Sequence, residues 1–263
     1  SMANNNYLRF RSGIFANSGE QRPEISITDA TGDGGDINIT TKQLFVKDGA
    51  ELSSATFGDG NAGNIKINTD YIEVSGSSEP ISESKDVNVV IVDQKEVSSS
   101  RQVFSTITAI SSGTTEDNGI VTSGNSGTIE INTKNLLISD GADISISVLG
   151  TNNQGESGTL TVKANKIELI GAGVNPNDPD NNFSRSGFFA ATEGTGDGGD
   201  LSIYTDTLII KDGARISTST RGPGKDSNNG GKGGNIKIEG EEIKIRGFFS
   251  EKPNDSDFFS GIF

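Results

Sequence analysis

A repeated pattern of apolar residues constrains the fold of this chain more than any other feature. In each repeat, apolar residues stand at a first position and again two, seven and nine residues later. The first position holds Ile37, Ile65, Ile129, Leu160, Leu201 and Ile236, and the last holds Val46, Val74, Ile138, Leu169, Ile210 and Ile245. Because all four positions are apolar in all six copies, we expect an array in which each repeat packs on its neighbours.

Each repeat has the pattern of short strands rather than of a helix. Apolar residues such as Ile37 and Ile39 alternate with polar ones such as Asn38, which is typical of a strand with one buried face. A corner that often contains threonine separates the first strand from the second. A third strand is expected at residues 51–56, 143–147 and 215–220. Three strands and three corners predict one coil of a parallel β-solenoid, with neighbouring coils about 4.8 Å apart.

Two classes of repeat alternate. One class carries Asp-Gly-Ala after the second strand, and the other carries a glycine followed by an insertion, at about 77–102, 172–185 and 250–257. The third strand then resumes, for example at 186–191, and residues 12–16 resemble the same strand. The insertions should therefore leave from one corner of alternate coils and align along one edge. Within the first insertion, residues 86–97 fit either a projecting β-hairpin or a loop that covers the edge of the core.

The expected architecture is all-β: a right-handed parallel β-helix of about seven three-strand coils. The handedness follows from the general preference of parallel crossovers. We treat residues 1–263 as a single β-solenoid segment, and expect the natural chain to continue on both sides. Uncapped end coils would then allow end-to-end self-association.

Composition narrows the classes of function. The formal net charge is −14, which argues against nucleic acid and anionic membranes as partners. The chain contains no cysteine and no histidine, so disulfides and the usual zinc, copper or haem ligands are excluded. No apolar run approaches the roughly 18 residues of a membrane-spanning helix.

Calcium is the one metal for which the sequence offers weak candidates. Two Gly-Asp-rich segments contain Asp33 and Asp36, and Asp197 and Asp200, and an acidic loop contains Asp178 and Asp180. Calcium requires several oxygens that converge on one point. Aspartate is never stacked on aspartate in successive repeats, which favours hydrogen bonding of these side chains to turn backbone. Both interpretations remain open, with calcium the less favoured.

Catalysis is the main rival to a structural role, because parallel β-helices also serve as scaffolds for polysaccharide-degrading enzymes. Such a site needs paired carboxylates and aromatic platforms. The chain has no tryptophan, and the outward positions of the first strands carry no carboxylate pair. Asp48, Asp140 and Asp212 recur in alternate coils, but each precedes Gly-Ala as in a turn. The phenylalanines at third strands and insertion borders are interpreted as stacked core residues: Phe15, Phe188, Phe189, Phe248, Phe249, Phe258 and Phe259.

Two recurring motifs are similar to those of a known family. Gly-Asn-Ile-Lys-Ile occurs at 63–67 and 234–238, Asp-Gly-Ala-x-Ile/Leu-Ser recurs, and the segment 55–65 is especially close. The chain resembles the repeats of large cyanobacterial exoproteins of the filamentous-haemagglutinin type. The resemblance implies a right-handed β-helix, secretion by a two-partner route, and a role in adhesion or matrix at the cell surface. The absence of cysteine agrees with a chain that crosses an outer membrane unfolded.

We therefore expect a non-catalytic, extracellular, structural or adhesive segment of a secreted surface protein, outside a Gram-negative-type envelope. It would have no resident cofactor and no membrane insertion, and its insertions would contact a surface glycan or protein. The alternatives are a carbohydrate-binding or carbohydrate-active β-helix protein and a calcium-dependent binding module.

Overall fold

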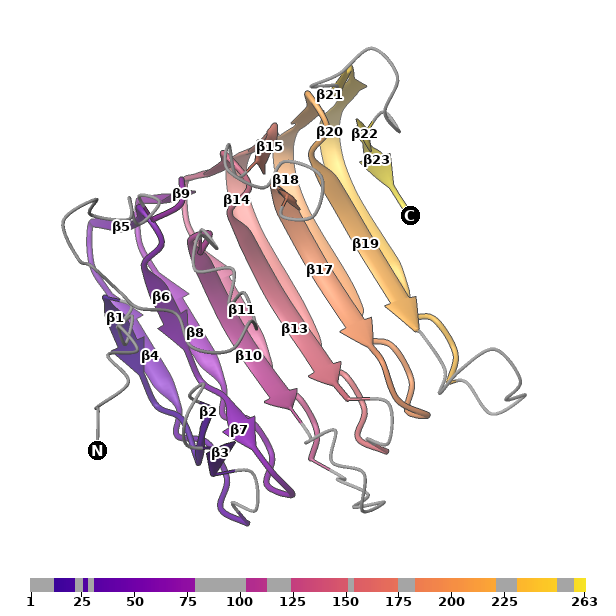
Figure 1. The fold of residues 1–263 in the computed structure, drawn as a ribbon. Helices are drawn as coiled ribbons and strands as arrows, with labels where there is room; N and C mark the ends of the chain where they lie inside the picture. Colours follow the sequence, from indigo (N-terminus) through magenta and orange to yellow (C-terminus); the bar gives the residue numbers. More distant parts are fainter. Residues whose placement is uncertain are drawn as a thin grey trace, which may run out of the picture.

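The computed structural model describes residues 12–21, 26–27, 31–78, 103–112, 124–150, 154–174, 183–220, 231–249 and 258–263. This part of the chain is all-β, and it contains no helix long and apolar enough to cross a membrane. Two large sheets of parallel strands form the body, and three two-stranded sheets are antiparallel. Figure 1 shows the strands side by side in chain order, with β1 and β23 at opposite ends of the array.

A nine-stranded sheet is formed by the first and second strands of the repeats. Its members are β4 (Ile37–Thr40), β5 (Gln43–Lys47), β8 (Ile65–Asn68), β9 (Tyr71–Ser75), β11 (Ile129–Asn132), β12 (Asn135–Ser139), β14 (Thr159–Ile170), β18 (Asp200–Lys211) and β20 (Ile236–Arg246). The first halves pair in the order β4-β8-β11-β14-β18-β20, and the second halves in the order β5-β9-β12-β14-β18-β20. All these pairs are parallel.

The eight-stranded sheet is formed by the third strands. It contains β1 (Gly13–Phe15), β6 (Glu51–Ser53), β7 (Thr56–Phe57), β10 (Thr106–Ser112), β13 (Asp143–Leu149), β17 (Gly187–Thr192), β19 (Arg215–Thr220) and β23 (Gly261–Ile262). The order is β1-β6-β10-β13-β17-β19-β23, and β7 pairs with β10. The predicted third strands are therefore confirmed as the members of one parallel sheet.

The apolar columns of the sequence stack in register. Ile37 pairs with Ile65 and Ile65 with Ile129, and the same column continues to Leu160, Leu201 and Ile236. Interior members of the columns are buried, with Ile67, Ile131 and Ile138 fully excluded from solvent. Burial of one such side chain contributes about 1.5–3 kcal/mol, so these columns are the main source of stability.

The corner between the first and second strands differs from the prediction in three repeats. Two short strands were expected in every repeat, but β14, β18 and β20 continue through the corner without interruption. The corner residues of these repeats pair with one another, as Ala164 does with Thr205 and Thr205 with Gly240. In the other repeats the two strands are separated at the corner, where a threonine side chain bonds to the backbone. Thr69 Oγ1, for example, donates to the carbonyl of Tyr71 at 3.2 Å.

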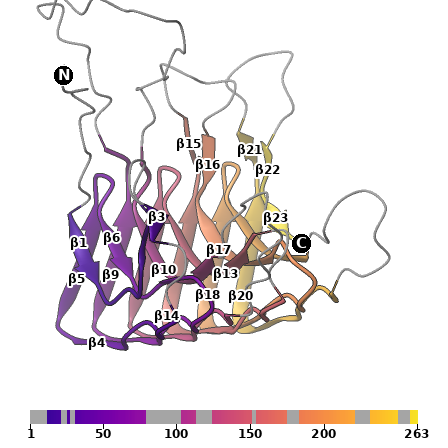
Figure 2. The same cartoon turned by 60° about the horizontal axis from the view of Figure 1, so that its bottom comes forward.

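One antiparallel strand pair lies within the predicted second insertion at 172–185, and another directly flanks the predicted third insertion at 250–257. β15 (Ala172–Val174) pairs with β16 (Phe183–Arg185), and β21 (Phe248–Phe249) pairs with β22 (Phe258–Phe259). Figure 2 shows both pairs rising from the same side of the array. The preceding glycines, Gly171 and Gly247, have φ of 78° and 81°, a backbone conformation that favours glycine. The predicted hairpin at 86–97 lies outside the described residues. The remaining pair, β2 (Glu20–Gln21) with β3 (Ser26–Ile27), is near the N-terminus.

Candidate functional site

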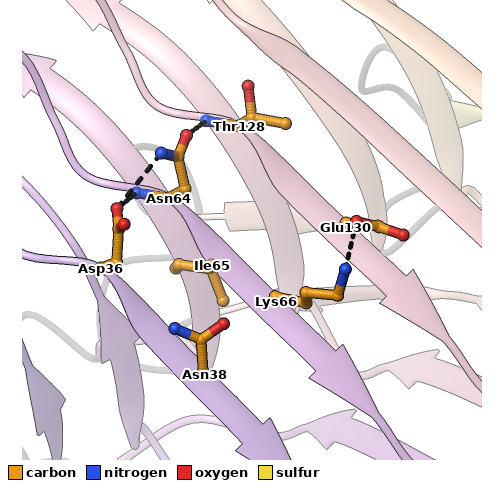
Figure 3. A pocket seen from close by; sticks show the side chains of 7 residues that line it. All are labelled: Asp36, Asn38, Asn64, Ile65, Lys66, Thr128 and Glu130. Atoms are coloured by element: carbon orange, nitrogen blue, oxygen red, sulfur yellow. Dashed lines mark hydrogen bonds and ion pairs between the residues drawn. The ribbon is translucent and has the colours of Figure 1, made fainter.

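A shallow depression of about 260 Å³ lies on the outer face of β4, β8 and β11. Its lining residues, shown in Figure 3, are Asp36, Asn38, Asn64, Ile65, Lys66, Thr128 and Glu130. These residues come from three neighbouring repeats, and the parallel register brings them together. The alignment of the repeats predicts two columns here, Asp36 with Asn64 and Thr128, and Asn38 with Lys66 and Glu130. The pairing of β4 with β8 and of β8 with β11 confirms that the members of each column lie side by side.

Side-chain oxygens along one wall of the depression bind the backbone of the next repeat. Asp36 Oδ1 accepts hydrogen bonds from the backbone N–H of Asn64 at 2.7 Å and from its side-chain amide at 3.2 Å. Asn64 Oδ1 in turn accepts the N–H of Thr128 at 3.0 Å. The dashed lines in Figure 3 follow this ladder. A carboxylate that accepts two hydrogen bonds in this way is held as a structural acceptor.

A second ladder repeats the arrangement three residues earlier in the sequence. Asp33 Oδ1 accepts from the N–H and the amide of Asn61 at 2.7 and 3.2 Å. Asn61 Oδ1 accepts the N–H of Asn125 at 3.0 Å, and Asn125 Oδ1 accepts that of Glu156 at 2.8 Å. Acidic and amide side chains therefore connect successive turns through their backbone.

The C-terminal Gly-Asp segment is bonded in the same way. Asp197 Oδ1 accepts the N–H of Lys232 at 2.7 Å. Asp200 Oδ1 accepts from the N–H and the amide of Asn235 at 2.7 and 3.1 Å. Among the described residues, no group of three or more acidic side chains is placed to hold a metal ion. Asp178 and Asp180, the other weak calcium candidates, lie outside the described residues.

An ion pair closes the other wall of the depression. Lys66 Nζ lies 3.1 Å from Glu130 Oε2, and Asn132 donates to Glu130 Oε1 at 3.2 Å. The hydrogen bond from Asn132, and then that from Lys66, hold the pKa of Glu130 below its usual value. A general acid needs the opposite shift, because it must keep its proton near neutral pH. The depression thus presents paired, hydrogen-bonded groups that can form polar contacts with a ligand.

The Asp-Gly-Ala corners are turns, as the sequence predicts. Asp48, Asp140 and Asp212 have φ of 57°, 57° and 56°, and the next glycines also have positive φ. The N–H of Ala50 donates to the carbonyl of Lys47 at 3.0 Å, and Ala142 and Ala214 make the equivalent bond. Positive φ at both central positions is the signature of a type I′ turn, which Asp-Gly favours. These aspartates therefore occupy turn positions.

A serine, buried in two of the three cases, connects each Asp-Gly-Ala corner to the next repeat. Ser105 Oγ accepts the N–H of Gly49 at 2.9 Å and donates to the carbonyl of Ser75 at 2.7 Å. Ser186 accepts from Gly141 at 3.0 Å, and Ser260 accepts from Gly213 at 2.9 Å. Each of these serines directly precedes a third strand that follows an insertion. This role was not predicted, although the recurrence of serine at this position was a usable signal.

The interpretation of the phenylalanines as stacked core residues is confirmed for Phe188 and is wrong for Phe15, Phe248 and Phe259. Phe188 is fully buried, whereas Phe15, Phe248 and Phe259 are about half exposed or more, at 46%, 55% and 61%. Phe188 stands in the inward column with Ile144 and Ile216, and its neighbour Phe189 stands in the opposite column with Ser145 and Ser217, because consecutive residues of a strand face opposite sides. Phe248 and Phe259 face each other in β21 and β22, with ring centroids 6.3 Å apart. The side chains of Phe249 and Phe258 are not among the described ones.

A column of glycines before the first strands was also missed. A Cβ on Gly127 would overlap the carbonyl oxygen of Gly63, and a Cβ on Gly63 would overlap that of Gly35. Gly158, Gly199 and Gly234 continue the column with the same close approach. These glycines allow two backbones to come together.

Comparisons with models of protein families, with curated proteins and with solved structures find no match to this chain.

Proposed function

We propose that this chain is a segment of an elongated right-handed parallel β-helix of about seven coils. In this proposal it belongs to a secreted surface protein of the filamentous-haemagglutinin type. Its role is structural and adhesive: the array carries the insertions at a distance from the cell. The observation that carries the proposal is the register, in which Ile37, Ile65 and Ile129 lie in one column with parallel neighbours on both sides of the interior strands.

The state of the acidic side chains supports a structural role over catalysis. Asp36 and Asp200 accept backbone hydrogen bonds from the next repeat. Glu73 and Glu130 are paired with lysines, and the pKa of each is lowered. A retaining or inverting glycosidase needs one carboxyl group with a raised pKa opposite a second carboxylate.

A glycan array combined with a reducing-sugar assay tests the proposal against a carbohydrate-active enzyme. We expect either binding without turnover or no glycan binding at all, and no release of reducing ends from any polysaccharide that binds. Release of reducing ends would contradict the proposal. Asp36→Asn and Glu130→Gln variants would then identify whether the depression in Figure 3 is the source of activity.

Thermal unfolding with calcium and with EDTA tests the calcium-dependent alternative. A ligand that binds only the folded state raises the midpoint according to its concentration over its Kd. We expect the same midpoint in both conditions, since Asp33, Asp36, Asp197 and Asp200 accept hydrogen bonds from backbone N–H groups. A rise of several degrees with calcium would favour the binding module.

Surface localisation is tested separately in the cells that produce the protein. Immunolabelling of intact cells with antibodies to the outer face of β18 should stain them without permeabilisation. Staining only after permeabilisation would contradict secretion and leave the fold unaffected.

A further inference from the structure

A row of outward side chains on the second strands alternates between apolar and charged residues. Its members pair in the order Phe45, Glu73, Leu137, Glu168, Ile209 and Lys244. Repeats with an Asp-Gly-Ala corner supply the apolar members, and repeats with an insertion supply the charged ones. Neighbouring strands are about 4.8 Å apart, so an apolar member recurs about every 9.6 Å along the row. Core packing does not require this alternation, because the row faces away from the interior.

An aromatic pair is the most exposed apolar part of the row. The Phe45 side chain is 52% exposed, and its ring centroid lies 5.7 Å from that of Tyr71, with the two planes tilted by 52°. An exposed aromatic surface is a common contact for a ligand that has an apolar face of its own. Because the row lies on the outer face, a further repeat before β4 and β5 would pair with the strand edge and leave this face open.

Polar groups are held in fixed positions beside the ring. Glu73 is the strand partner of Phe45. Its carboxylate accepts from the Ser75 hydroxyl at 3.0 Å and the Tyr71 hydroxyl at 3.4 Å, and it lies 2.8 Å from Lys47 Nζ. Carboxylate oxygens have capacity for further donors, and the Lys47 side chain remains 44% exposed. An apolar surface is therefore bordered by preorganised donors and acceptors.

This combination favours a sugar over other ligands with an apolar face. Two rings beside a carboxylate resemble a site for a quaternary ammonium, but the Lys47 ammonium already occupies the carboxylate of Glu73. The core of a protein interface is depleted of charged residues, whereas this row alternates them with apolar ones. The net charge of −14 opposes the stacking of nucleic-acid bases. A pyranose has a C–H face for the ring and hydroxyl groups for Glu73 and Lys47.

The spacing of the row extends this match from one sugar to a chain. In an extended β-(1→4)-linked glycan, each sugar advances by slightly more than one strand spacing, and each disaccharide by slightly more than two. A chain laid along the row would therefore place alternate sugars over Phe45, Leu137 and Ile209. The sugars between them would lie over Glu73 and Glu168, where carboxylates accept from hydroxyl groups.

We infer that the outer face of the second strands binds a neutral, extended β-(1→4)-linked glycan, with Phe45 and Tyr71 as the principal contact. The inference rests on the proposed adhesive role, to which it adds a class of ligand and a binding surface on the sheet itself. It involves binding alone, without cleavage of the glycan.

Titration calorimetry of the full chain with cellohexaose, together with pull-down on microcrystalline cellulose, tests the inference. Phe45→Ala removes the exposed ring, and Phe45→Tyr retains it. Phe15→Ala is the matched control, since Phe15 is 46% exposed but belongs to the eight-stranded sheet. Circular dichroism confirms that each variant is folded.

The expected result is that wild type, Phe45→Tyr and Phe15→Ala bind both probes alike, and that Phe45→Ala binds about tenfold more weakly, the scale of one lost stacking contact. A wild-type protein that binds neither probe overturns the inference and leaves the structural role of the array intact. Unchanged binding by Phe45→Ala also overturns it, as does loss of binding in Phe45→Tyr or Phe15→Ala. Binding that depends on Phe45 and is accompanied by release of reducing ends would support the binding surface and contradict the non-catalytic role.

Discussion

At the scale of single residues, the amide and carboxylate ladders show how polar side chains accept hydrogen bonds from the backbone N–H groups that precede the first strands. The side chains of Asp36 and Asn64 have nearly the same shape but different roles. The carboxylate of Asp36 only accepts hydrogen bonds, whereas the amide of Asn64 both donates and accepts them. The backbone N–H groups of Asn64, Thr128 and Asn235 are each satisfied by a side chain of the preceding repeat. An asparagine after an aspartate therefore avoids repulsion between stacked charges and still offers an oxygen to the backbone N–H of the next repeat.

Exchange of these two residues tests that explanation. Asn64→Asp places a second carboxylate next to Asp36 and removes the donor to it, and we expect a loss of about 0.5–1 kcal/mol in the free energy of unfolding at neutral pH. The double variant Asp36→Asn/Asn64→Asp restores one amide and one carboxylate and should recover most of that loss. Urea unfolding measures both. Equal stability of the single and double variants would contradict charge repulsion as the cause.

The pH dependence of the Glu73 cluster is a second prediction at this scale. The hydrogen bond from Lys47, at 2.8 Å, is the largest cause that holds the pKa of Glu73 below its ordinary value of 4.5, with Ser75 and Tyr71 as further donors. A lowered folded pKa means that the stabilisation is present above pH 4.5 and is lost as the pH falls through the folded value. Wild type should therefore be more stable than Glu73→Gln at pH 7, and this advantage should shrink at pH 3. An advantage that is constant with pH would show that ionisation of Glu73 is not the source.

At the scale of the elements, the segment before each first strand is as constrained as the strand itself. The glycine column at 35, 63, 127, 158, 199 and 234 brings the backbones of successive repeats together. This close contact fixes the point at which the following strands begin to pair in parallel, as Ile65 does with Ile129. An alanine in this column would push on backbone, which cannot move aside as a flexible side chain could.

Gly127→Ala is the corresponding prediction. Its methyl group would overlap the carbonyl of Gly63, and we expect a loss of about 1–3 kcal/mol in the free energy of unfolding. Gly233→Ala is the control, since nothing lies within 4 Å of its Cβ position, and its effect should stay within about 0.5 kcal/mol. Urea unfolding measures both variants. Similar midpoints for the two would contradict the close approach.

At the scale of the whole molecule, stability is distributed along the array. Each repeat contacts the repeats beside it, as the pairing of β14 with β18 and of β18 with β20 shows. Removal of a neighbour exposes the columns of the next repeat, which explains the exposure of Ile243 and Ile245 at the end. Such an array unfolds from its ends or at its weakest interface.

An engineered disulfide tests the register at this scale. Thr161 and Ser202 are direct partners in β14 and β18, and the chain contains no native cysteine to compete. Thr161→Cys/Ser202→Cys should oxidise to a single intramolecular disulfide and stabilise the protein by about 3–4 kcal/mol in the chain-entropy model. Thr161→Cys/Ser217→Cys, with its cysteines on different sheets, should stay reduced. Mass spectrometry and non-reducing electrophoresis distinguish the two outcomes.

The repeat pattern was sufficient to predict which aliphatic residues of the first and second strands face inward, where the Asp-Gly turns lie and where the insertions leave. The columns from Ile37 to Ile236 and the turns at Asp48, Asp140 and Asp212 could be predicted because local pattern controls them: alternation selects one face of a strand, and Asp-Gly tolerates positive φ. Predicting these features does not require knowing which residue of the neighbouring repeat lies opposite.

Several contacts between repeats could be seen only in the folded structure. The close approach of Gly127 to Gly63, the bond of Ser105 to Gly49, and the exposure of Phe15 and Phe248 depend on which residue of another repeat lies opposite. Asn64 and Thr128 are 64 residues apart in the sequence, whereas Asp36 and Asn64 are 28 residues apart. Insertions of such different lengths change the separation in sequence but not in space. The alignment of the repeats therefore predicts that these residues stack, and the folded structure shows which of their atoms form the hydrogen bonds.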